Sequence, residues 1–533
     1  MNQPDRTGIL QASLSRRRVL AGLAGVGAGS LLTACTSSST TSAVTTAGKP
    51  KRGGDLVLGL PGGSSSDTLK ADTGLTDVDY LRILSLYQPL VQLSPQSGIE
   101  YVLAESITPD NGSLSRWIIS LRSGITFHSG KPLTAADVVF TFNRIITGDL
   151  PGSSPLAPVD LTNTKALDDR TVQVEMTRPY SSFVEQLAAI FVYLPIVPEG
   201  FKDAPGVYDG TGPFVYKSFS PGQRSVFTRN PNYWKSGLPY ADTLTVIDFA
   251  DTVSMVDALT TGVIHGAGLL DGPSMAQLAN TSGVAIVPSR SGNITPFTMR
   301  VDQPPFNDVR VRQALRLLVD RPQLIDSALD GYGTIANDVF SPFDPDFDQS
   351  LVRQQDIPQA KSLLKAAGHE GLTVPLVTSA VSTGTVAMAT VLAEQATAAG
   401  VTIKVQNVPP GTFFGPNYLQ WTFSQDYYPY SPYLPQVAYS MLPKSPFNET
   451  HTNNSGYISL YNQANAAPSG SSLYKELLYK MQEFDFTQGG YIIPAYINAL
   501  DAYSDKVGGY TKTNTAEGNP LSNFDVEHFY FTS

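Results

Sequence analysis

The stretch that decides the fold runs from residue 356 to residue 408 and reads DIPQAKSLLKAAGHEGLTVPLVTSAVSTGTVAMATVLAEQATAAGVTIKVQNV. Its first part predicts a helix. Asp356 is a suitable N-cap, Pro358 suits the first turn, and Gly368 suits the residue that ends a helix. The apolar side chains between them fall on one face, as expected for a helix that packs on a core.

The rest of this stretch predicts a strand, a helix and a second strand. The strand covers 372–377, the helix covers about 385–399 and is closed by Gly400, and the second strand covers 401–408 with alternating apolar residues. Such a unit favours a parallel sheet. Ligands of open α/β sheets bind outside the strand ends, so we expect the site in a cleft between two α/β lobes.

Residues 117–140 predict two further strands followed by a helix. The first strand is 117–121, and glycine-containing turns separate it from a second strand and from the helix. Thr134 is a suitable N-cap, and Asp137 three residues later completes a capping-box variant. The apolar residues that share one face of this helix are Val138, Phe142 and Ile145.

The N-terminus predicts an export signal at residues 1–34. Arginines at 16–18 precede an apolar run from Val19 to about Ala34, with small residues at its end. This glycine-rich run falls short of the ~20 strongly apolar residues that a membrane span needs. Cys35 is the only cysteine, so the chain forms no internal disulfide.

Composition indicates a folded, acidic protein behind this signal. The formal net charge is −10, which gives no electrostatic reason to bind nucleic acid. Residues 35–52 are rich in Ser, Thr, Ala and Gly and predict a flexible tether. The globular part begins with a strand pattern at 54–60, and the rest is long enough for two or three domains.

Several motifs resemble known bacterial signatures. The arginine pair before Val19-Leu20 resembles a twin-arginine export signal, and Leu32-Thr33-Ala34-Cys35 resembles a lipobox, in which the cysteine carries the lipid. From residue 54 to the C-terminus the chain resembles the family 5 solute-binding proteins of ATP-binding-cassette importers, which include oligopeptide-, dipeptide- and nickel-binding proteins. The segments that carry this resemblance are 103–106, 117–140, 210–214, 229–234, 305–315, 320–321 and 356–368.

The resemblance implies a two-lobed, α/β periplasmic-binding-protein-like fold of type II, similar to cluster C, with an extra inserted domain. The expected parts are a first lobe from 53–88, 210–300 and 505–533, an inserted domain at 89–209, and a second lobe at 301–504. Chain crossings near residues 300 and 504 would act as hinge strands and allow closure around a ligand.

The most informative stretch for binding is 413–439, which is crowded with aromatic residues and has Asp426 as its only charged residue. Prolines at 429, 432 and 435 predict a strand followed by a loop, with no regular helix after Tyr428. In peptide-binding family members the matching strand pairs with the ligand backbone, and an aspartate just after it holds the ligand's ammonium. That role transfers to Asp426, with Trp421, Thr422, Phe423 and Tyr427 as further contacts.

This alignment leaves a choice of register. Peptide binders commonly have a tryptophan three residues before the aspartate, whereas here Phe423 is at that place and Trp421 lies five residues before. The alternative is that the rings form core and Asp426 forms a turn. A weaker match, Gly74-Leu75-Thr76, predicts a second contact with the ligand. The partner of a ligand carboxylate is not identified, although Arg290, Arg300 and Arg353 are available.

Enzymatic motifs are weak. The five histidines are scattered without metal-ligand spacing, so we expect no metal site and no cofactor. Ser362-Leu363-Leu364-Lys365 has the Ser-x-x-Lys spacing of penicillin-binding enzymes, but the companion motifs are missing. We therefore expect no catalytic residues.

These observations predict a monomeric, lipid-anchored extracytoplasmic receptor on the outer face of the cytoplasmic membrane or in the periplasm. It would capture short peptides and deliver them to the permease subunits of an importer. An oligosaccharide, a metal chelate or another small solute is an alternative ligand, and a non-transport receptor or a hydrolase is an alternative function.

Overall fold

A computed structural model describes residues 49–64, 67–74, 76–94, 98–153, 155–204, 206–510, 521 and 524–532. The chain divides into two compact units, Met1–Ser42 and Ala43–Ser533, and everything described below belongs to the second unit. The export signal, Cys35 and most of the tether that the sequence predicts lie outside the described residues. Within the described ranges, no helix is both long and apolar enough to cross a membrane.

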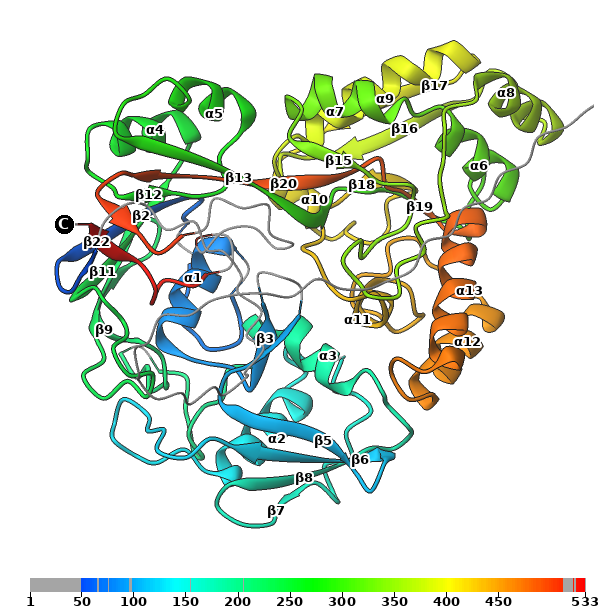
Figure 1. The fold of residues 1–533 in the computed structure, drawn as a ribbon. Helices are drawn as coiled ribbons and strands as arrows, with labels where there is room; N and C mark the ends of the chain where they lie inside the picture. Colours follow the sequence, from blue (N-terminus) through cyan, green and yellow to red (C-terminus); the bar gives the residue numbers. More distant parts are fainter. Residues whose placement is uncertain are drawn as a thin grey trace, which may run out of the picture. The chain divides into compact units, whose positions relative to one another are not determined.

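The first lobe is built on an eight-stranded sheet (Figure 1). Strand β2 pairs in parallel with β11 and β12, and β20 pairs antiparallel with β12, β13 and β15. The strands in sheet order are β13 (Val284–Ile294), β20 (Ala495–Ser504), β12 (Gly266–Ala267), β2 (Asp55–Pro61), β11 (Thr243–Phe249), β10 (Arg224–Arg229) and β9 (Phe214–Ser220), with β15 (Gly333–Ile335) beside β20.

Alternating residues of β2 explain how helices cover both faces of this sheet. Leu56, Leu58 and Leu60 are buried in a cluster that includes α1 (Asp77–Leu86). Val57 packs against a different cluster formed with α4 (Thr252–Thr260) and α5 (Gly272–Leu278). Since successive side chains of a strand point to opposite faces, α1 lies on one side of the sheet and α4 and α5 lie on the other (Figure 1).

The described chain begins with a strand where the sequence predicts the end of a tether. Pro50–Lys51 forms β1, which pairs with β22 (Tyr530–Thr532), and β22 pairs with β21 (Val507–Gly508). The tether predicted to reach residue 52 is therefore too long at its C-terminal end, because the last strand of the chain supplies backbone partners for residues 50 and 51.

The inserted domain has its own sheet and core. The capping box predicted at Thr134 and Asp137 is present at the start of α2, and the predicted apolar face of α2 is buried. The elements of this domain are β5 (Ala104–Asp110), β6 (Ser113–Leu121), β8 (Thr171–Glu175) and β7 (Lys165–Ala166) in sheet order, the pair β3 (Val91–Leu93) and β4 (Ile99–Tyr101), α2 (Ala135–Thr147), α3 (Phe183–Ala189) and the 3-10 turn Phe191–Tyr193.

The second lobe contains the strand–helix–strand unit that the sequence predicts. Asp356 caps the first helix by accepting from the Gln359 N–H, and β16 and β17 pair in parallel. The sheet order is β17 (Thr402–Asn407), β16 (Thr373–Thr378), β18 (Phe423–Gln425), β14 (Phe297–Met299) and β19 (Tyr491–Ile492). Its helices are α6 (Val309–Leu317), α7 (Arg321–Leu329), α8 (Ile357–Ala366), α9 (Thr385–Ala396) with the 3-10 turn Thr397–Ala399, α10 (Pro410–Phe413), α11 (Tyr433–Ser440), α12 (Ser455–Ala466) and α13 (Ser472–Gln488).

Two chain crossings join the lobes. Strand β13 belongs to the first sheet and the next strand, β14, belongs to the second, while β19 belongs to the second sheet and β20 belongs to the first. The crossings therefore lie at about 294–297, a few residues before the expected boundary at 300, and at about 492–495, roughly ten residues before the expected boundary at 504. The mixed α/β fold of the described chain agrees with the predicted fold class.

The structure corrects one expectation in the aromatic stretch. The prolines were expected to exclude a helix after Tyr428, but α11 runs from Tyr433 to Ser440 with Pro432 as its N-cap and Pro435 in its first turn. Proline is tolerated there because the first N–H groups of a helix have no acceptor within the helix.

Candidate functional site

Asp426 lies directly after β18 and is almost fully buried, with 2% of its surface exposed. Its Oδ2 accepts a hydrogen bond from the Tyr418 hydroxyl at 2.8 Å, and its Oδ1 accepts the Tyr427 N–H at 2.8 Å. Because β18 runs parallel to β16, Asp426 lies at the carboxyl edge of these parallel strands, where α/β folds place ligands.

A second buried carboxyl group contacts Asp426. Glu449 is 3% exposed, hydrogen-bonds Asp426 through its side chain, and accepts from the Tyr428 hydroxyl at 2.6 Å. Burial and the nearby Asp426 carboxylate raise the pKa of Glu449 well above its ordinary value. Burial also raises the pKa of Asp426, while hydrogen bonds oppose that rise.

A group of tyrosines connects this pair to the other two parts of the protein. Tyr80 of α1 and Tyr193 of the inserted domain place their hydroxyl oxygens 2.6 Å apart. Tyr193 also hydrogen-bonds Tyr439 of α11, and the pKa of Tyr439 is raised by burial and by the charge of Asp426 among other groups. These contacts bring the first lobe, the inserted domain and the second lobe together at one place.

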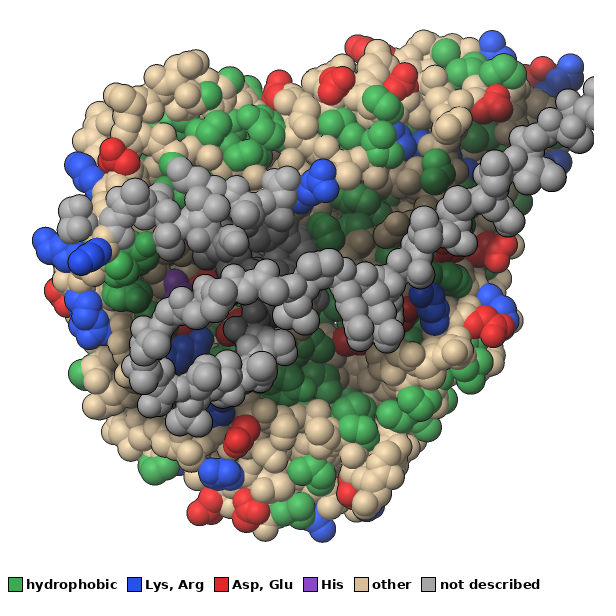
Figure 2. Space-filling model, in the orientation of Figure 1, with side chains coloured by type: hydrophobic (Ala, Val, Ile, Leu, Met, Phe, Trp, Pro, Cys, Tyr) green, Lys and Arg blue, Asp and Glu red, His purple; other side chains and the backbone are tan. Residues whose placement is uncertain are grey.

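Asp77 completes this group from the first lobe. Burial raises the pKa of Asp77 to about 6, and the charges of Asp77 and Asp426 both contribute to a raised pKa of Tyr427, after burial. We call Asp77, Tyr80, Tyr193, Asp426, Tyr427, Tyr439 and Glu449 the inter-lobe cluster. In Figure 2, hydrophobic side chains gather on this face of the protein in the region of α3 in Figure 1.

The weak match at 74–76 leads directly into this cluster. Gly74 is buried, and a Cβ placed there would lie 2.7 Å from Ile83 Cδ1, so the close approach of the backbone to α1 favours glycine. Thr76 caps α1 by accepting from the Asp79 N–H at 3.3 Å. Leu75 lies outside the described residues. The structure thus places this loop just before Asp77.

The residues expected to pair with a ligand backbone are engaged inside the protein. Phe423 is buried in the core of the second lobe, and β18 has β14 on one side and β16 on the other. The Thr422 carbonyl accepts the Arg300 N–H at 3.0 Å. The Trp421 indole donates to the Phe413 carbonyl at 3.3 Å. A ligand that used this strand edge would have to displace these contacts.

Two of the three arginines considered for a ligand carboxylate are paired with acids. Arg300 forms a 2.6 Å ion pair with Asp302, and Arg353 pairs with the buried Asp338. Arg290 is exposed on β13, the strand that leads to the crossing between the lobes.

The sequence did not single out Asp77, Tyr80, Tyr193 or Glu449. Each belongs to a segment whose local pattern is that of an ordinary helix or loop, and only the tertiary contacts bring them together. The one local signal in the sequence was the N-cap residue Thr76, which marks the start of α1 directly before Asp77.

Other candidate sites are less suited to binding. Asp525, Glu527 and His528 are the one group in the described ranges whose ligand atoms lie close enough to hold a metal. However, Lys235 Nζ already neutralises Glu527 at 2.6 Å, and Asp525 pairs with His528 at 2.7 Å. Ser362, the residue of the hydrolase alternative, is exposed in the middle of α8.

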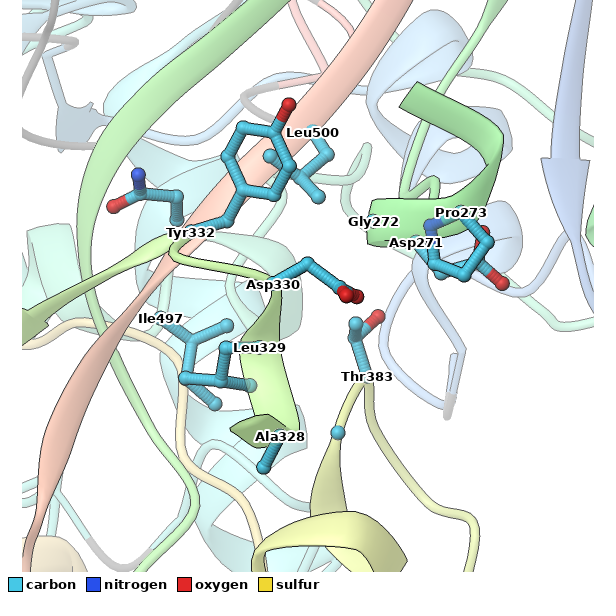
Figure 3. Close-up of a pocket in the computed structure, with 12 residues that line it drawn as sticks. Asp271, Gly272, Pro273, Ala328, Leu329, Asp330, Tyr332, Thr383, Ile497 and Leu500 are labelled. Atoms are coloured by element: carbon cyan, nitrogen blue, oxygen red, sulfur yellow. The ribbon is translucent and has the colours of Figure 1, made fainter. Parts of the chain in front are cut away.

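A small cavity of about 130 Å³ lies beside the hinge strand β20, between α5 and the end of α7 (Figure 3). Asp330 and Thr383 point toward its centre, with Asp271 and Gly272 opposite. A Cβ on Gly272 would lie 2.2 Å from Asp330 Oδ2, so glycine allows this close approach. The cavity is too small for a peptide and lies at the hinge, apart from the inter-lobe cluster.

Comparison with known proteins identifies the family. Residues 98–456 match the model of bacterial extracellular solute-binding proteins, family 5. The chain is 28% identical over 325 residues to the glutathione-binding protein GsiB of Escherichia coli strain K12, a match that covers 59% of this chain and 62% of that protein. The match therefore spans about three fifths of the length of this curated relative.

Solved structures share the fold at low sequence identity. The chain superposes on DppA of Helicobacter pylori, solved with the peptide STSA, with a TM-score of 0.76 and 20% identity, covering 91% of this chain and 99% of that one. It superposes on the oligopeptide-binding protein AppA of Bacillus subtilis, solved with a nonapeptide, with a TM-score of 0.76 and 22% identity, covering 91% and 100%. The chain belongs to family 5 of the bacterial extracellular solute-binding proteins.

Proposed function

We propose that this protein is the substrate-binding component of an ATP-binding-cassette importer and captures short peptides between its two lobes. The observation that carries this proposal is the inter-lobe cluster, in which buried carboxyl groups and tyrosine rings from three parts of the chain meet. In the described ranges no lysine or arginine forms an ion pair with Asp426, Glu449 or Asp77, so the cluster can accept a cation from outside.

The chemistry of the cluster suits the amino terminus of a peptide. A carboxylate shielded from water attracts an ammonium group more strongly than an exposed one does. Ring faces add a further attraction for cations of about 0.5–2 kcal/mol. Asp426 is the residue we assign to the ligand's ammonium, with Tyr427 beside it. The loop at 74–76 supplies contacts from the opposite lobe.

Contacts between the parts support a closed, ligand-capturing arrangement. The inserted domain reaches α12 of the second lobe, where Ser182 Oγ donates to Asn465 Oδ1 at 2.6 Å and Arg178 donates to Asn462 Oδ1 at 2.9 Å. These contacts join the inserted domain to the second lobe, so a movement that separated these two parts would break them.

Export and anchoring complete the proposal. The chain would leave the cytoplasm by its twin-arginine-like signal, carry lipid on Cys35, act as a monomer with the proposed three-part division, and deliver its closed form to the membrane permease. Palmitate labelling of the protein in its native host, compared with a Cys35→Ala variant, tests the anchor: label on both forms would contradict it.

Thermal-shift measurements with defined peptides test the ligand class. Trialanine is expected to raise the melting temperature, because a ligand that binds only the folded state stabilises it, and N-acetyl-trialanine is expected to do so much less. Asp426→Asn should weaken trialanine binding by about 10- to 100-fold, the usual worth of a hydrogen bond to a charged group.

The exposed Asp326→Asn in α7 is the matched control and should bind as the wild type does. If sugars or metal chelates stabilise the protein and no di- to pentapeptide does, the peptide assignment is wrong. If peptides bind and Asp426→Asn has no effect, the site assignment is wrong.

A further inference from the structure

Glu449 is a buried titratable group that the proposed binding mode does not use. It contacts Asp426 but lies on a different segment, in the loop between α11 and α12. Asp426 and Glu449 pack together and have no ion-pair partner in the described ranges. Ionising both carboxyl groups at once is therefore unfavourable in free energy. Two like charges in contact repel more strongly in a site shielded from water than they do at the surface.

The hydrogen-bond donors around the pair decide which carboxyl group keeps a proton. Asp426 accepts from a hydroxyl and from a backbone N–H, both at 2.8 Å, and these donors favour its ionised form. Glu449 accepts from the Tyr428 hydroxyl on Oε1, and its side chain also hydrogen-bonds Asp426. The geometry therefore matches a neutral Glu449 that donates to an ionised Asp426.

We propose that Glu449 is a positioning residue that holds a proton beside Asp426 and releases it as a cationic ligand group arrives. This inference rests on the proposed function, because it assigns Asp426 to the ligand's cation. The O–H bond of Glu449 breaks, its electron pair stays on the carboxylate, and the proton passes to the solvent buffer. The Asp426–Glu449 pair thereby gains a second negative charge only when a positive charge has entered.

The other titratable groups that face the pair do not compete for this role. They are all tyrosines, and burial raises the pKa of each, so they stay neutral in the working range. These residues are Tyr418, Tyr427, Tyr428, Tyr439 and Tyr491. Thr298, the remaining polar partner of Glu449, does not titrate.

Glu449→Gln is the informative variant, because glutamine keeps the shape, can accept from Tyr428 and can donate to Asp426, but cannot lose a proton. The first measurement needs no ligand. Infrared difference spectra at pH 7 should show a protonated-carboxyl band in the wild type that Glu449→Gln loses. Glu185→Gln removes another buried acid with a raised pKa, of about 8, and should retain the Glu449 band.

The second measurement is calorimetric titration of trialanine in buffers of different ionisation enthalpy. The wild type should release protons above neutral pH, and its affinity relative to Glu449→Gln should rise by up to about tenfold per pH unit. Titration of the peptide's own amino group affects both proteins equally and cancels in this ratio.

The outcomes separate the two proposals. If the difference between the wild-type and Glu449→Gln spectra shows no protonated-carboxyl band, or if both proteins release the same number of protons, the role of Glu449 is refuted. If trialanine binds neither protein, the proposed ligand class fails, and the infrared comparison alone decides whether Glu449 holds the proton.

Discussion

At the residue scale, Asp338 shows how a charge buried in the second lobe is neutralised within a short network. Asp338 is 1% exposed, pairs with Arg321 at 2.9 Å and with Arg353, and accepts the Ile493 N–H at 2.9 Å. This carboxylate joins the segment after β15 to the start of the second crossing. The inter-lobe cluster differs because its carboxyl groups have no basic partner in the described ranges.

Asp338→Asn is expected to lower the free energy of unfolding by about 3 kcal/mol. Breaking a buried ion pair by removing one partner leaves two arginines poorly compensated. Urea titration should show an earlier transition for this variant, whereas the exposed Asp326→Asn should unfold with the wild type. Equal midpoints for all three proteins would show that the network contributes nothing to stability.

At the scale of elements, helix ends explain most of what local sequence could predict. The caps at Asp356 and Thr134, the apolar face of α2, and the unit β16–α9–β17 all follow from patterns within about 50 residues. Helix α11 was not predicted, because the sequence alone does not distinguish a proline in the first turn of a helix from a proline that ends one.

The capping box of α2 gives an element-scale prediction. Asp137 is fully buried and accepts from the Thr134 N–H at 2.7 Å, the Thr134 hydroxyl at 2.8 Å, the Glu199 N–H at 2.7 Å and Lys131 Nζ at 2.7 Å. Thr134→Ala removes one of these donors, the Thr134 hydroxyl, and should lower the free energy of unfolding by about 1 kcal/mol.

Asp137→Ala removes the acceptor of the Thr134 and Glu199 N–H groups. It should lower the free energy of unfolding by about 3 kcal/mol. Fluorescence of Trp117, which lies in the same core, can follow urea unfolding of this domain. The order of the two variants is the test: if Thr134→Ala is the more damaging one, Asp137 is not the centre of this cap.

At the scale of the whole molecule, the site could be predicted only in part. Asp426 and the loop at 74–76 were expected from family matches, the second of them a weak one; in the structure Asp426 contacts Glu449, and Thr76 lies directly before Asp77 of the inter-lobe cluster. Glu449 and Tyr193 reach it through tertiary packing of segments that carry no local signal. Phe423, which the family match suggests as a ligand contact, is buried in the core of the second lobe, and its contact with a ligand stays a prediction.

The contact between the inserted domain and the second lobe should depend on pH. Burial, with the charges of Asp344 and Asp346, raises the pKa of Glu185 to about 8. A carboxyl group whose pKa is higher in the folded protein than in the unfolded chain stabilises the fold while it is protonated. For Glu185 this contribution is fully present below the ordinary pKa of a glutamic acid and is lost as the pH rises through about 8.

We therefore expect the melting temperature of Glu185→Gln, relative to the wild type, to rise between pH 5 and about pH 8 and to level off at higher pH. Glu483→Gln, an exposed substitution on α13, should show no such trend. A constant difference between Glu185→Gln and the wild type across this range would contradict the assignment of Glu185 as a neutral buried acid.

The central claim is that the lobes close on a solute whose cationic end meets Asp426. Small-angle X-ray scattering of the full chain, with and without trialanine, tests it most directly. The account predicts that saturating peptide reduces the radius of gyration of the wild type and leaves that of Asp426→Asn unchanged at the same concentration. A radius of gyration that stays constant in the wild type while calorimetry shows the peptide bound would contradict the claim.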